Sequence, residues 1–352
     1  MTMSGYEMIK RNVKFEDPER IGLRFTSLGV GDVFRIYTQK PRAIRQSCEE
    51  PCMTKKTRTI PGTVDEWGCK WESNEEVKDG GTKNSDLGQP TTFPIVDWEK
   101  DYADYKVPDP YAEGRFDGLE EALSRPEAQG KWIQLNSPYC IFERLHFLRG
   151  FENTLMDLYI YKDQIEDLID KLTDYQIGIV RQAAELGKGR IHCFDTTDDW
   201  GTQTGLMISP DMWRELFKPR YKRLIDEIHK AGMVIRFHTD GKVNDILEDF
   251  VEIGVDIVNI HQPQLLGIKE VGEKFAGRIC FEAAVDIQDT LPKGDKGLIE
   301  QEVKDLIKYW ATPHGGLIGV EYRYLSVIGA KQEDLEFAYE CFKKYGNLEE
   351  KR

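Results

Sequence analysis

The chain of 352 residues lacks several features that would mark a membrane, secreted or nucleic-acid-binding protein. No apolar run approaches the roughly 18 to 20 residues that a helix needs to cross a bilayer, and the start of the chain lacks the apolar centre of a signal peptide. We therefore expect a cytoplasmic protein with no membrane contact. The formal charge of −14 argues against nucleic acid as a partner, so small molecules and proteins are expected instead.

Cysteine is too scarce and too scattered to build a disulfide framework. The seven cysteines are an odd number, spread through a long chain that has no secretory signal. The rest of the composition, with 40% hydrophobic and 31% charged residues, is that of a globular enzyme. The core must therefore form by packing, and the chemistry must come from polar side chains.

From residue 131 onward, short apolar runs rich in Val, Ile and Phe alternate with longer segments of helical periodicity. Strands are expected at 131–136, 190–195, 233–238, 255–260, 278–283 and 316–321, and an earlier one at 20–25. Helices are expected over 5–13, 209–232, 242–254, 298–310 and 332–346. In the second of these, Ser209 is the expected N-cap and Gly232 the expected residue just beyond the end.

Strands that alternate with helices pair in parallel, and parallel strands need both faces covered. We therefore predict one α/β domain over 1–352, a TIM (β/α)8 barrel with an N-terminal extension or insertion that caps one end. The eighth strand could lie at 32–38 or at 65–72. Residues 38–130 break the rhythm and are expected to form the cap, with a small hairpin around Trp67 to Trp71.

Polar side chains gather where the expected strands end, which is the edge at which a TIM barrel builds its active site. Six consecutive strands end in groups able to bind a metal, move a proton or hold an anion. These groups are Gln134, Asn136, Asp195, Thr196, Asp198, Asp199, His238, Asp240, His261, Gln262, Glu282, Glu321, Tyr322 and Arg323. The stability of a barrel alone does not require so many polar groups at its strand ends.

Each of these groups also has a plainer interpretation. The stretch "HTDG", with His238 and Asp240, could be a satisfied histidine beside a polar turn, since Asp before Gly is a common turn signal. Acidic residues at the ends of the strands before and after this stretch favour the interpretation of His238 and Asp240 as metal ligands. Asp198 and Asp199 could cap a loop or act as catalytic carboxylates that tune each other's pKa. Aromatic residues such as Trp200 could fill the core or line an apolar pocket.

Six stretches carry a resemblance to a known family. They are "GFENTLMDLY", "DDWGTQTGLMISPDMWRELFKPRYKRLIDEIHKAG", "FHTDGKV", "LEDFVEIGVDIVNIHQPQ", "VDIQDTLPKG" and "AYECFKKYG". Over nearly all of 131–346 the chain resembles the uroporphyrinogen decarboxylase superfamily, and the long second stretch resembles most its corrinoid-linked methyltransferase branch. The resemblance implies a TIM barrel with its pocket at the carboxyl ends of the strands, in agreement with the periodicity.

Two departures from the family pattern narrow what the resemblance implies. The Arg-rich signature of true decarboxylases has no counterpart near "RIGLRFTSLGVGDVF", which disfavours decarboxylation of a tetrapyrrole. Methyltransferases of this family that act between a corrinoid protein and a thiol hold zinc with a His-x-Cys pair and a later Cys. Here His238 matches the histidine of that pattern, and Asp240 stands at the position of its first cysteine. The position of the later cysteine falls near Glu321. Zinc accepts carboxylates, and with fewer thiolates it would be the stronger Lewis acid, which suits polarising an ether oxygen.

The leading hypothesis is a zinc-dependent methyltransferase that moves a methyl group from a small methoxylated, aromatic substrate to cob(I)alamin on a partner corrinoid protein. The expected metal ligands are His238, Asp240 and Glu321, with Glu282 or Cys280 as substitutes. The expected catalytic residues are Asp198, Asp199 and Arg323, and the expected substrate-binding residues are Asn136, Tyr139, Trp200, His261 and Tyr322. Assembly as a homo-oligomer stays open.

Three alternatives also stay open on the sequence. Methyl could pass from methylcobalamin to a thiol or a pterin, or a metal-free decarboxylase or lyase could use the acids for proton transfer alone. A non-catalytic scaffold could bind a corrinoid protein, although a scaffold needs no such set of polar strand ends. The substrate depends on how 38–130 shapes the mouth of the barrel, because fold does not decide chemistry in this family.

Overall fold

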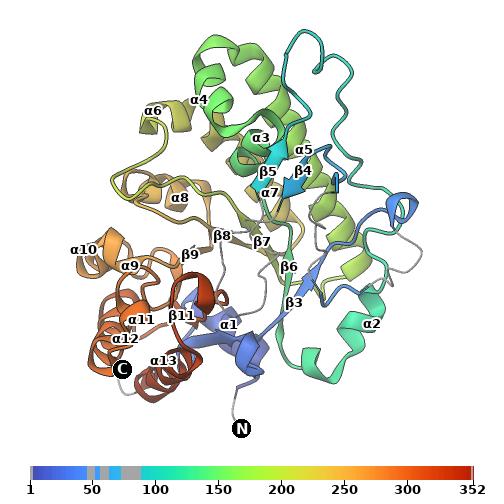
Figure 1. Ribbon diagram of the computed structural model, residues 1–352. Helices are drawn as coiled ribbons and strands as arrows, with labels where there is room; N and C mark the ends of the chain where they lie inside the picture. Colours follow the sequence, from blue (N-terminus) through green and yellow to red (C-terminus); the bar gives the residue numbers. More distant parts are fainter. Residues whose placement is uncertain (1–2, 46–51, 56–62, 73–88, 350–351) are drawn as a thin grey trace.

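The computed structural model describes residues 3–45, 52–55, 63–72, 89–349 and 352. Eight parallel strands form a nearly closed barrel, and helices pack around its outer side, as the periodicity predicted (Figure 1). The parallel strands are β1 (Gly22–Phe25), β3 (Val33–Tyr37), β6 (Trp132–Asn136), β7 (Cys193–Thr197), β8 (Val234–His238), β9 (Ile257–Ile260), β10 (Cys280–Ala283) and β11 (Leu317–Val320). Of the two candidates for the eighth strand, 32–38 is confirmed, because it supplies β3.

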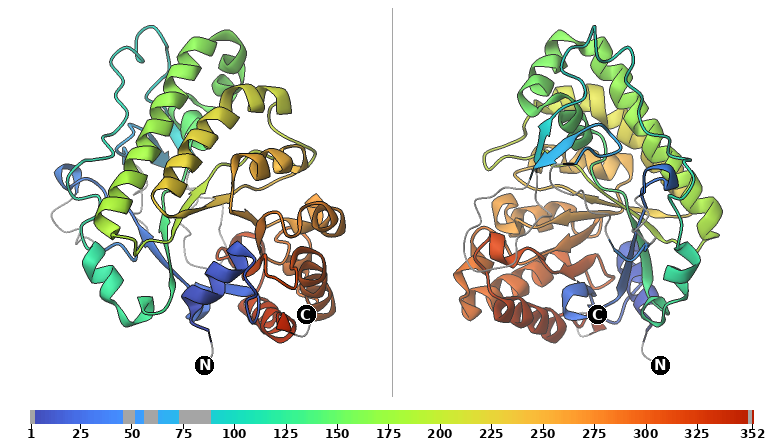
Figure 2. Two further views of the ribbon diagram at one scale, coloured as in Figure 1. Left: turned by 180° about the vertical axis from the view of Figure 1, so that it is seen from behind. Right: turned by 45° about the vertical axis from the view of Figure 1, so that its right-hand side comes forward.

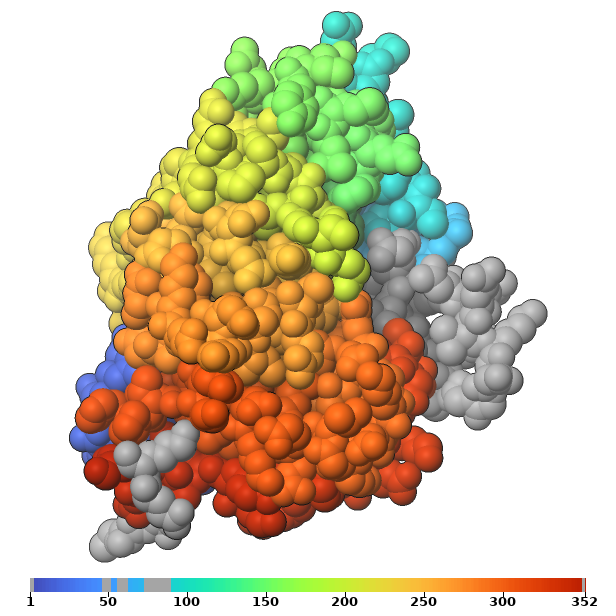
Figure 3. Space-filling view, turned by 90° about the vertical axis from the view of Figure 1, so that its left-hand side faces the viewer, coloured from blue at the N-terminus to red at the C-terminus, as the bar shows by residue number. Residues whose placement is uncertain are grey.

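Helices cover the outside of the barrel and its amino end (Figure 2). They are α1 (Gly5–Lys14), α2 (Leu119–Ser124), α3 (Phe142–Arg149), α4 (Phe151–Ile160), α5 (Lys162–Gly187), α6 (Pro210–Met212), α7 (Lys218–Lys230), α8 (Leu247–Ile253), α9 (Pro263–Leu266), α10 (Ile268–Phe275), α11 (Thr290–Lys293), α12 (Lys296–Trp310) and α13 (Gln332–Tyr345). On the face shown in Figure 3, consecutive parts of the chain lie beside one another in bands, as repeated strand–helix units require. Among the described residues, no helix combines the length and the apolar character that crossing a membrane demands.

The predicted helix over 209–232 is confirmed at its ends and interrupted in its middle. The side chain of Ser209 caps the first turn, and Gly232 follows the last turn with a left-handed φ of 76°. Between them, a π-helical turn at Trp213–Phe217 precedes Pro219. Proline has no N–H, so the α-helical hydrogen-bond ladder cannot pass through this position unchanged.

Asp32 joins the two ends of the barrel sheet. Among the described residues no ladder pairs β1 with β3, and β1 instead pairs antiparallel with the short strand β2 (Val30–Gly31). The N–H of Asp32 donates to the Leu23 carbonyl at 2.7 Å, and its own carbonyl accepts from the N–H of Trp132 at 2.9 Å. Its carboxylate accepts from both ends of the Arg20 guanidinium at 2.8 Å. One residue therefore bridges the gap where strand pairing stops.

Residues 38–130 connect β3 to β6, and 46–51, 56–62 and 73–88 lie outside the described residues. A bridge between Val64 and Lys70 closes a small hairpin at the predicted position. The strand that follows, β4 (Lys70–Glu72), pairs antiparallel with β5 (Gln89–Thr92).

Aromatic residues attach this hairpin to the helices that follow β6. The ring of Trp67 lies edge-on to Tyr175 of α5 at 4.7 Å, and the ring of Trp71 lies edge-on to Phe147 of α3 at 5.1 Å. Both tryptophans are buried. Because α3 begins beyond the carboxyl end of β6, these contacts place the hairpin near that side of the barrel. The single domain with 38–130 as its cap stays a prediction.

An apolar layer fills the amino end of the barrel. Side chains of a strand point inward at every second residue, so one inward residue from each neighbouring strand falls at the same level. This layer contains Val33, Trp132, Cys193, Val234, Ile257, Cys280 and Ile318, and α1 packs Ile9 and Val13 against it. Cys280, predicted as a substitute metal ligand, is thus surrounded by apolar side chains far from the strand ends. Burial also raises the pKa of its thiol well above the ordinary value, which disfavours a thiolate ligand, and its role as a metal ligand stays a prediction.

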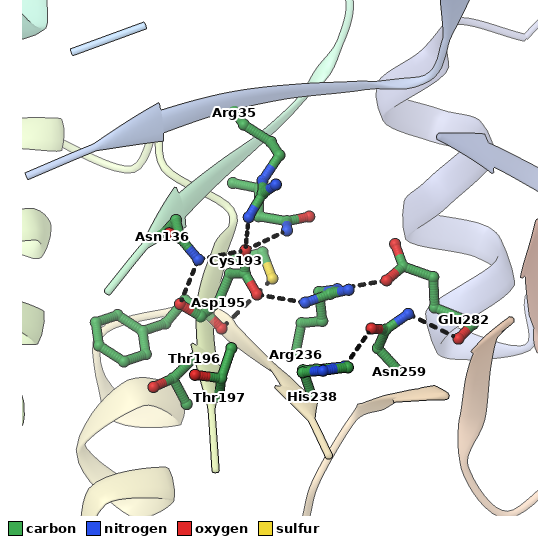
Figure 4. A network of polar contacts seen from close by, with 12 residues as sticks. Arg35, Asn136, Cys193, Asp195, Thr196, Thr197, Arg236, His238, Asn259 and Glu282 are labelled. Atoms are coloured by element: carbon green, nitrogen blue, oxygen red, sulfur yellow. Dashed lines mark hydrogen bonds and ion pairs between the residues drawn. The ribbon is translucent and has the colours of Figure 1, made fainter. Parts of the chain in front are cut away.

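Five charged side chains, four of them buried, form the next layer toward the carboxyl end. Figure 4 shows Arg35, Asp195, Arg236 and Glu282 of this layer. Arg24 places Nε 2.6 Å from Oε1 of Glu282, and Arg35 places Nη2 2.8 Å from Oδ2 of Asp195. Arg236 lies between the two acids, with Nη1 2.5 Å from Oδ1 of Asp195 and Nε bonded to Glu282. The layer therefore ties β1, β3, β7, β8 and β10 together inside the barrel.

Two predicted site residues belong to this layer. Burial alone would raise the pKa of Glu282, but the charges of Arg236 and Arg24 lower it to about 2, so the carboxylate stays ionised. Glu282, predicted as a substitute metal ligand, is therefore held by two arginines. Asn136, predicted to bind substrate, donates its amide to Asp195 at 2.9 Å. These contacts engage Glu282 and the amide nitrogen of Asn136 within the barrel, and the roles expected of the two residues stay predictions.

Replacing Glu282 by glutamine is expected to lower the free energy of unfolding by about 3–5 kcal/mol at neutral pH, because Arg24 would keep a buried charge without its partner and Arg236 would lose one of its two acids. The folded pKa of Glu282 is about 2 and its ordinary value is 4.5. Its contribution is therefore complete above about 4.5 and is lost as the pH falls toward 2. Urea unfolding of the wild type and the variant at a series of pH values measures this difference.

The matched control is Glu113→Gln, which removes the exposed partner of Arg42 and should leave stability nearly unchanged. A Glu282→Gln variant as stable as the wild type at neutral pH would contradict an ionised, charge-compensating Glu282. So would a stability difference that stays constant down to low pH.

Candidate metal centre and active site

His238, Asp240 and His261 meet at the carboxyl ends of β8 and β9. Each offers one ligand atom, and these atoms lie within 4.8 Å of one another. Oδ2 of Asp240 lies 3.5 Å from Nε2 of His238 and 3.5 Å from Nδ1 of His261. Two imidazoles and one carboxylate, with a further position left for water or substrate, form a ligand set that zinc takes at catalytic sites.

The turn after β8 holds Asp240 close to His238 through backbone contacts. The N–H of Asp240 donates to Oδ1 of Asp199 at 2.9 Å, and its carbonyl accepts from the N–H of Gly201 at 3.1 Å. Gly241 has a left-handed φ of 82°, and a Cβ there would lie 2.2 Å from the backbone of Gly201. The turn "TDG" is therefore packed against the loop after β7, and this packing fixes the position of the carboxylate.

His238 is oriented by Asn259 on the neighbouring strand (Figure 4). The amide nitrogen of Asn259 donates to the Glu282 carbonyl at 3.0 Å, so its oxygen faces Nδ1 of His238 at 2.7 Å. Nδ1 therefore carries the proton and donates, which leaves Nε2 with a lone pair on the side of Asp240. An imidazole held in this way is prepared to bind a metal ion.

His261 and Asp240 also have the protonation states that metal binding requires. Burial lowers the pKa of His261 despite the charge of Asp240, so its ring is neutral, and Nδ1 is buried without a hydrogen-bond partner in the described part of the chain. Burial acts to raise the pKa of Asp240, but the two imidazoles outweigh it and keep that pKa well below its usual range. An unpaired ring nitrogen beside an anionic carboxylate fits a metal site.

Asp198 and Asp199, both predicted as catalytic, have different surroundings. Asp198 accepts from the N–H groups of Ile141 at 2.7 Å and Glu143 at 2.7 Å, at the start of α3, and from the Tyr221 hydroxyl at 2.5 Å. Burial raises its pKa to about 6 against these bonds. Its oxygens anchor the start of α3, and its catalytic role stays a prediction. Asp199 lies with Oδ1 3.7 Å from Nε2 of His238 and stays a candidate.

Glu143 is a candidate that the sequence reasoning missed. Its Oε2 accepts from the Thr197 hydroxyl at 2.6 Å, and Thr197 lies beside His238 in the register of β7 and β8. Burial raises the pKa of Glu143 well above its ordinary value, and the charges of Asp199 and Asp198 raise it further. Its surroundings therefore favour the protonated form of this carboxyl, close to the candidate metal cluster. Glu143 lies in α3, the helix after β6, and therefore outside the strand ends at which the sequence predicts site residues.

Glu321, the third predicted ligand, lies apart from the cluster. It accepts from the Thr26 hydroxyl at 2.7 Å and from the N–H of Ser27 at 3.0 Å, so it ties the end of β11 to the turn after β1. Two strands separate β11 from β8, and this distance around the barrel explains why His261 takes the expected place of Glu321 in the cluster. Arg323 is half exposed with Nε 4.0 Å from Glu321, and its catalytic role stays a prediction.

The aromatic residues predicted to bind substrate fall into two groups. Trp200 is completely buried, stacks on Phe142 at 4.2 Å and donates its indole N–H to Tyr221 at 3.2 Å. It packs in the core, and its role in substrate binding stays a prediction. Tyr322 lies edge-on to His261 at 5.4 Å, at the border of the metal centre. Tyr139 has a φ of 60°, an unfavourable value for a non-glycine residue that is typical of functional sites.

The purified protein is expected to hold about one zinc ion per chain, which His261→Ala should abolish. Asn259→Leu keeps all three ligands, but His238 loses the acceptor that fixes its tautomer, so zinc affinity should fall about 10-fold to 100-fold. Competition with a chelating dye measures these affinities. His314→Ala, at an exposed histidine paired with Asp17, is the control and should bind zinc as the wild type does. Equal affinity in all four proteins would contradict the cluster as a metal site.

Comparison with known proteins places the chain in a family. Residues 87–319 match the family described as uroporphyrinogen decarboxylase (URO-D), and the sequence matches none of the curated proteins compared with it. The structure is similar to a methyltransferase from Methanosarcina mazei, with 18% sequence identity, a TM-score of 0.59, and coverage of 79% of this chain and 76% of that one. This likeness shows a shared fold.

A native xylanase 10B from Thermotoga maritima is less similar, with 11% identity, a TM-score of 0.41, and coverage of 68% of this chain and 82% of that one, which is too distant to carry an argument. The family match spans well over half of the chain and contains all three residues of the metal cluster. The chain therefore belongs to the uroporphyrinogen decarboxylase family.

Proposed function

We propose that the protein is a zinc-dependent methyltransferase that moves a methyl group from a small methoxylated, aromatic substrate to cob(I)alamin on a partner corrinoid protein. The observation that carries this proposal is the cluster of His238, Asp240 and His261 at the carboxyl ends of neighbouring strands. The resemblance of the sequence to the corrinoid-linked branch and the fold shared with the methyltransferase from Methanosarcina mazei support it.

The ligand set favours cleavage of an ether. Neutral imidazoles and a single carboxylate donate less charge than thiolates do, so a bound zinc ion would polarise the ether oxygen and stabilise the charge that develops on the departing phenolate. Asn259 keeps His238 in the tautomer that binds through Nε2, and burial keeps His261 neutral. Asp240 supplies the negative charge of the set.

Two acids beside the cluster complete the proposed chemistry. Glu143 holds a proton on its carboxyl, next to Thr197, and delivers it to the oxygen that leaves as the methyl group departs. Asp199, close to Nε2 of His238, takes the orienting role that the sequence assigned jointly to Asp198 and Asp199. Tyr322 covers His261 from the side, and burial and the charge of Asp240 raise the pKa of its phenol to about 12, so it is neutral and can donate a hydrogen bond.

The wild-type protein is expected to convert cob(I)alamin to methylcobalamin when a methoxyarene is supplied, as followed by the cobalamin absorption spectrum. His238→Ala should lower this rate by roughly 100-fold or more, because the transition-state charge loses its stabilisation. The exposed variant His314→Ala should react at the wild-type rate.

Three other results would each overturn the proposal. Consumption of methylcobalamin with a thiol or pterin acceptor, and no reaction of cob(I)alamin, would reverse the direction of transfer. Release of carbon dioxide with no need for cobalamin would mean a decarboxylase. Full activity of His238→Ala would remove the metal centre from the mechanism.

A further inference from the structure

We propose that Arg144 binds a carboxylate group of the substrate, so that the substrate class is a methoxylated aromatic acid. The placing of the methoxy group at the metal centre rests on the proposed function. The anion site itself is argued from the contacts of Arg144 with Asp65 and with the aromatic rings around it, independently of the metal centre.

Arg144 is a buried arginine with poorly compensated charge. Its side chain is 9% exposed, and the acid paired with it, Asp65, places Oδ2 3.8 Å from Nη1. Within the described part of the chain, Nε and Nη1 have no hydrogen-bond partner. Arg149, one turn further along α3, instead brings Nε within 2.6 Å of Asp157. A buried guanidinium with two nitrogens that lack hydrogen bonds is unfavourable, and a bound anion removes that penalty.

Asp65 is already engaged by the turn that contains it. Its Oδ1 accepts from the N–H groups of Trp67 and Cys69, each at 2.9 Å, and its Oδ2 accepts from the indole N–H of Trp71 at 2.8 Å. These bonds hold the carboxylate in the hairpin and keep it beyond the 2.7–2.9 Å typical of a charged hydrogen bond to Arg144. The arginine therefore retains donors for a further ligand.

Aromatic rings surround the guanidinium of Arg144. Its central carbon lies 4.2 Å from the ring centroid of Trp67, 5.4 Å from that of Tyr139 and 5.9 Å from that of Phe147. Rings over the faces of a guanidinium leave its edges for hydrogen bonds, and those edges match the two oxygens of a carboxylate. The same rings offer apolar surface to an arene attached to that carboxylate.

Arg144 and the metal cluster lie on the two sides of the end of β7. Tyr139, which packs on Arg144, donates its N–H to the Thr197 hydroxyl at 3.0 Å, and Thr197 neighbours His238 in the sheet. The anionic carboxylate of Asp240 beside His238 would repel a substrate carboxylate placed at the metal cluster itself. A flat aromatic acid would place its methoxy group at the metal cluster and its carboxylate at the guanidinium of Arg144.

Calorimetric titration of the zinc-loaded wild type with para-methoxybenzoate and with its neutral amide, para-methoxybenzamide, tests the anion site without cobalamin. The acid is expected to bind about tenfold or more tightly than the amide, since hydrogen bonds to a charged group carry the difference. Arg144→Met keeps the packing of the stem and should abolish the preference. Arg144→Lys keeps the positive charge but lacks the two parallel N–H donors of a guanidinium, so it should retain only part of the preference for the acid. Arg223→Met, at an exposed arginine, is the control and should bind as the wild type does.

Equal affinity of the wild type for acid and amide overturns the proposal, and this comparison needs no variant that must fold. A preference that survives in Arg144→Met also overturns it. If the acid preference is present but no methyl reaches cob(I)alamin, the proposed function fails while the anion site stands. If methyl transfer occurs and acid and amide bind equally, the anion site fails alone.

Discussion

Arg236 lies between Asp195 and Glu282 in the middle of the barrel, and its ion pairs join β7, β8 and β10. Buried charges are tolerated only when they are paired and hydrogen-bonded, so this layer constrains the relative heights of the strands that contribute to it. His238 lies two residues beyond Arg236 on β8, on the same inward face. The ion pairs thus determine the level at which His238 and Asn259 meet, and the metal centre is built on this layer.

The metal centre differs in chemistry from a thiolate site on the same fold. A carboxylate at Asp240 and an imidazole at His261 would supply less charge to a bound ion than cysteines would, and in the proposed mechanism Glu143 would supply the proton. Asn259 joins the two layers, because its amide bonds to both the β10 backbone and His238. The arrangement is suited to activating an oxygen leaving group.

The wall formed by α3 adds specificity to this centre. Asp198 anchors the first turn of α3 through backbone N–H groups, and that turn carries Glu143 toward Thr197 and Arg144 toward the aromatic hairpin. Packing of Trp67 and Trp71 against α3 and α5 makes the segment between β3 and β6 part of this wall. The proposed substrate contacts therefore depend on packing between parts of the chain that are distant in sequence.

The sequence by itself determined the strand and helix succession, the capping by Ser209 and the nearness of His238 to Asp240, because periodicity, caps and a two-residue spacing are local properties of the backbone. Only the tertiary structure decided which distant strand ends meet. His261 joins the cluster because β9 is the neighbour of β8, whereas Glu321 is two strands further on. The partners of Glu282 and the buried nitrogens of Arg144 that lack hydrogen bonds in the described part of the chain likewise follow from strand order, register and helix packing, which no local pattern of residues encodes.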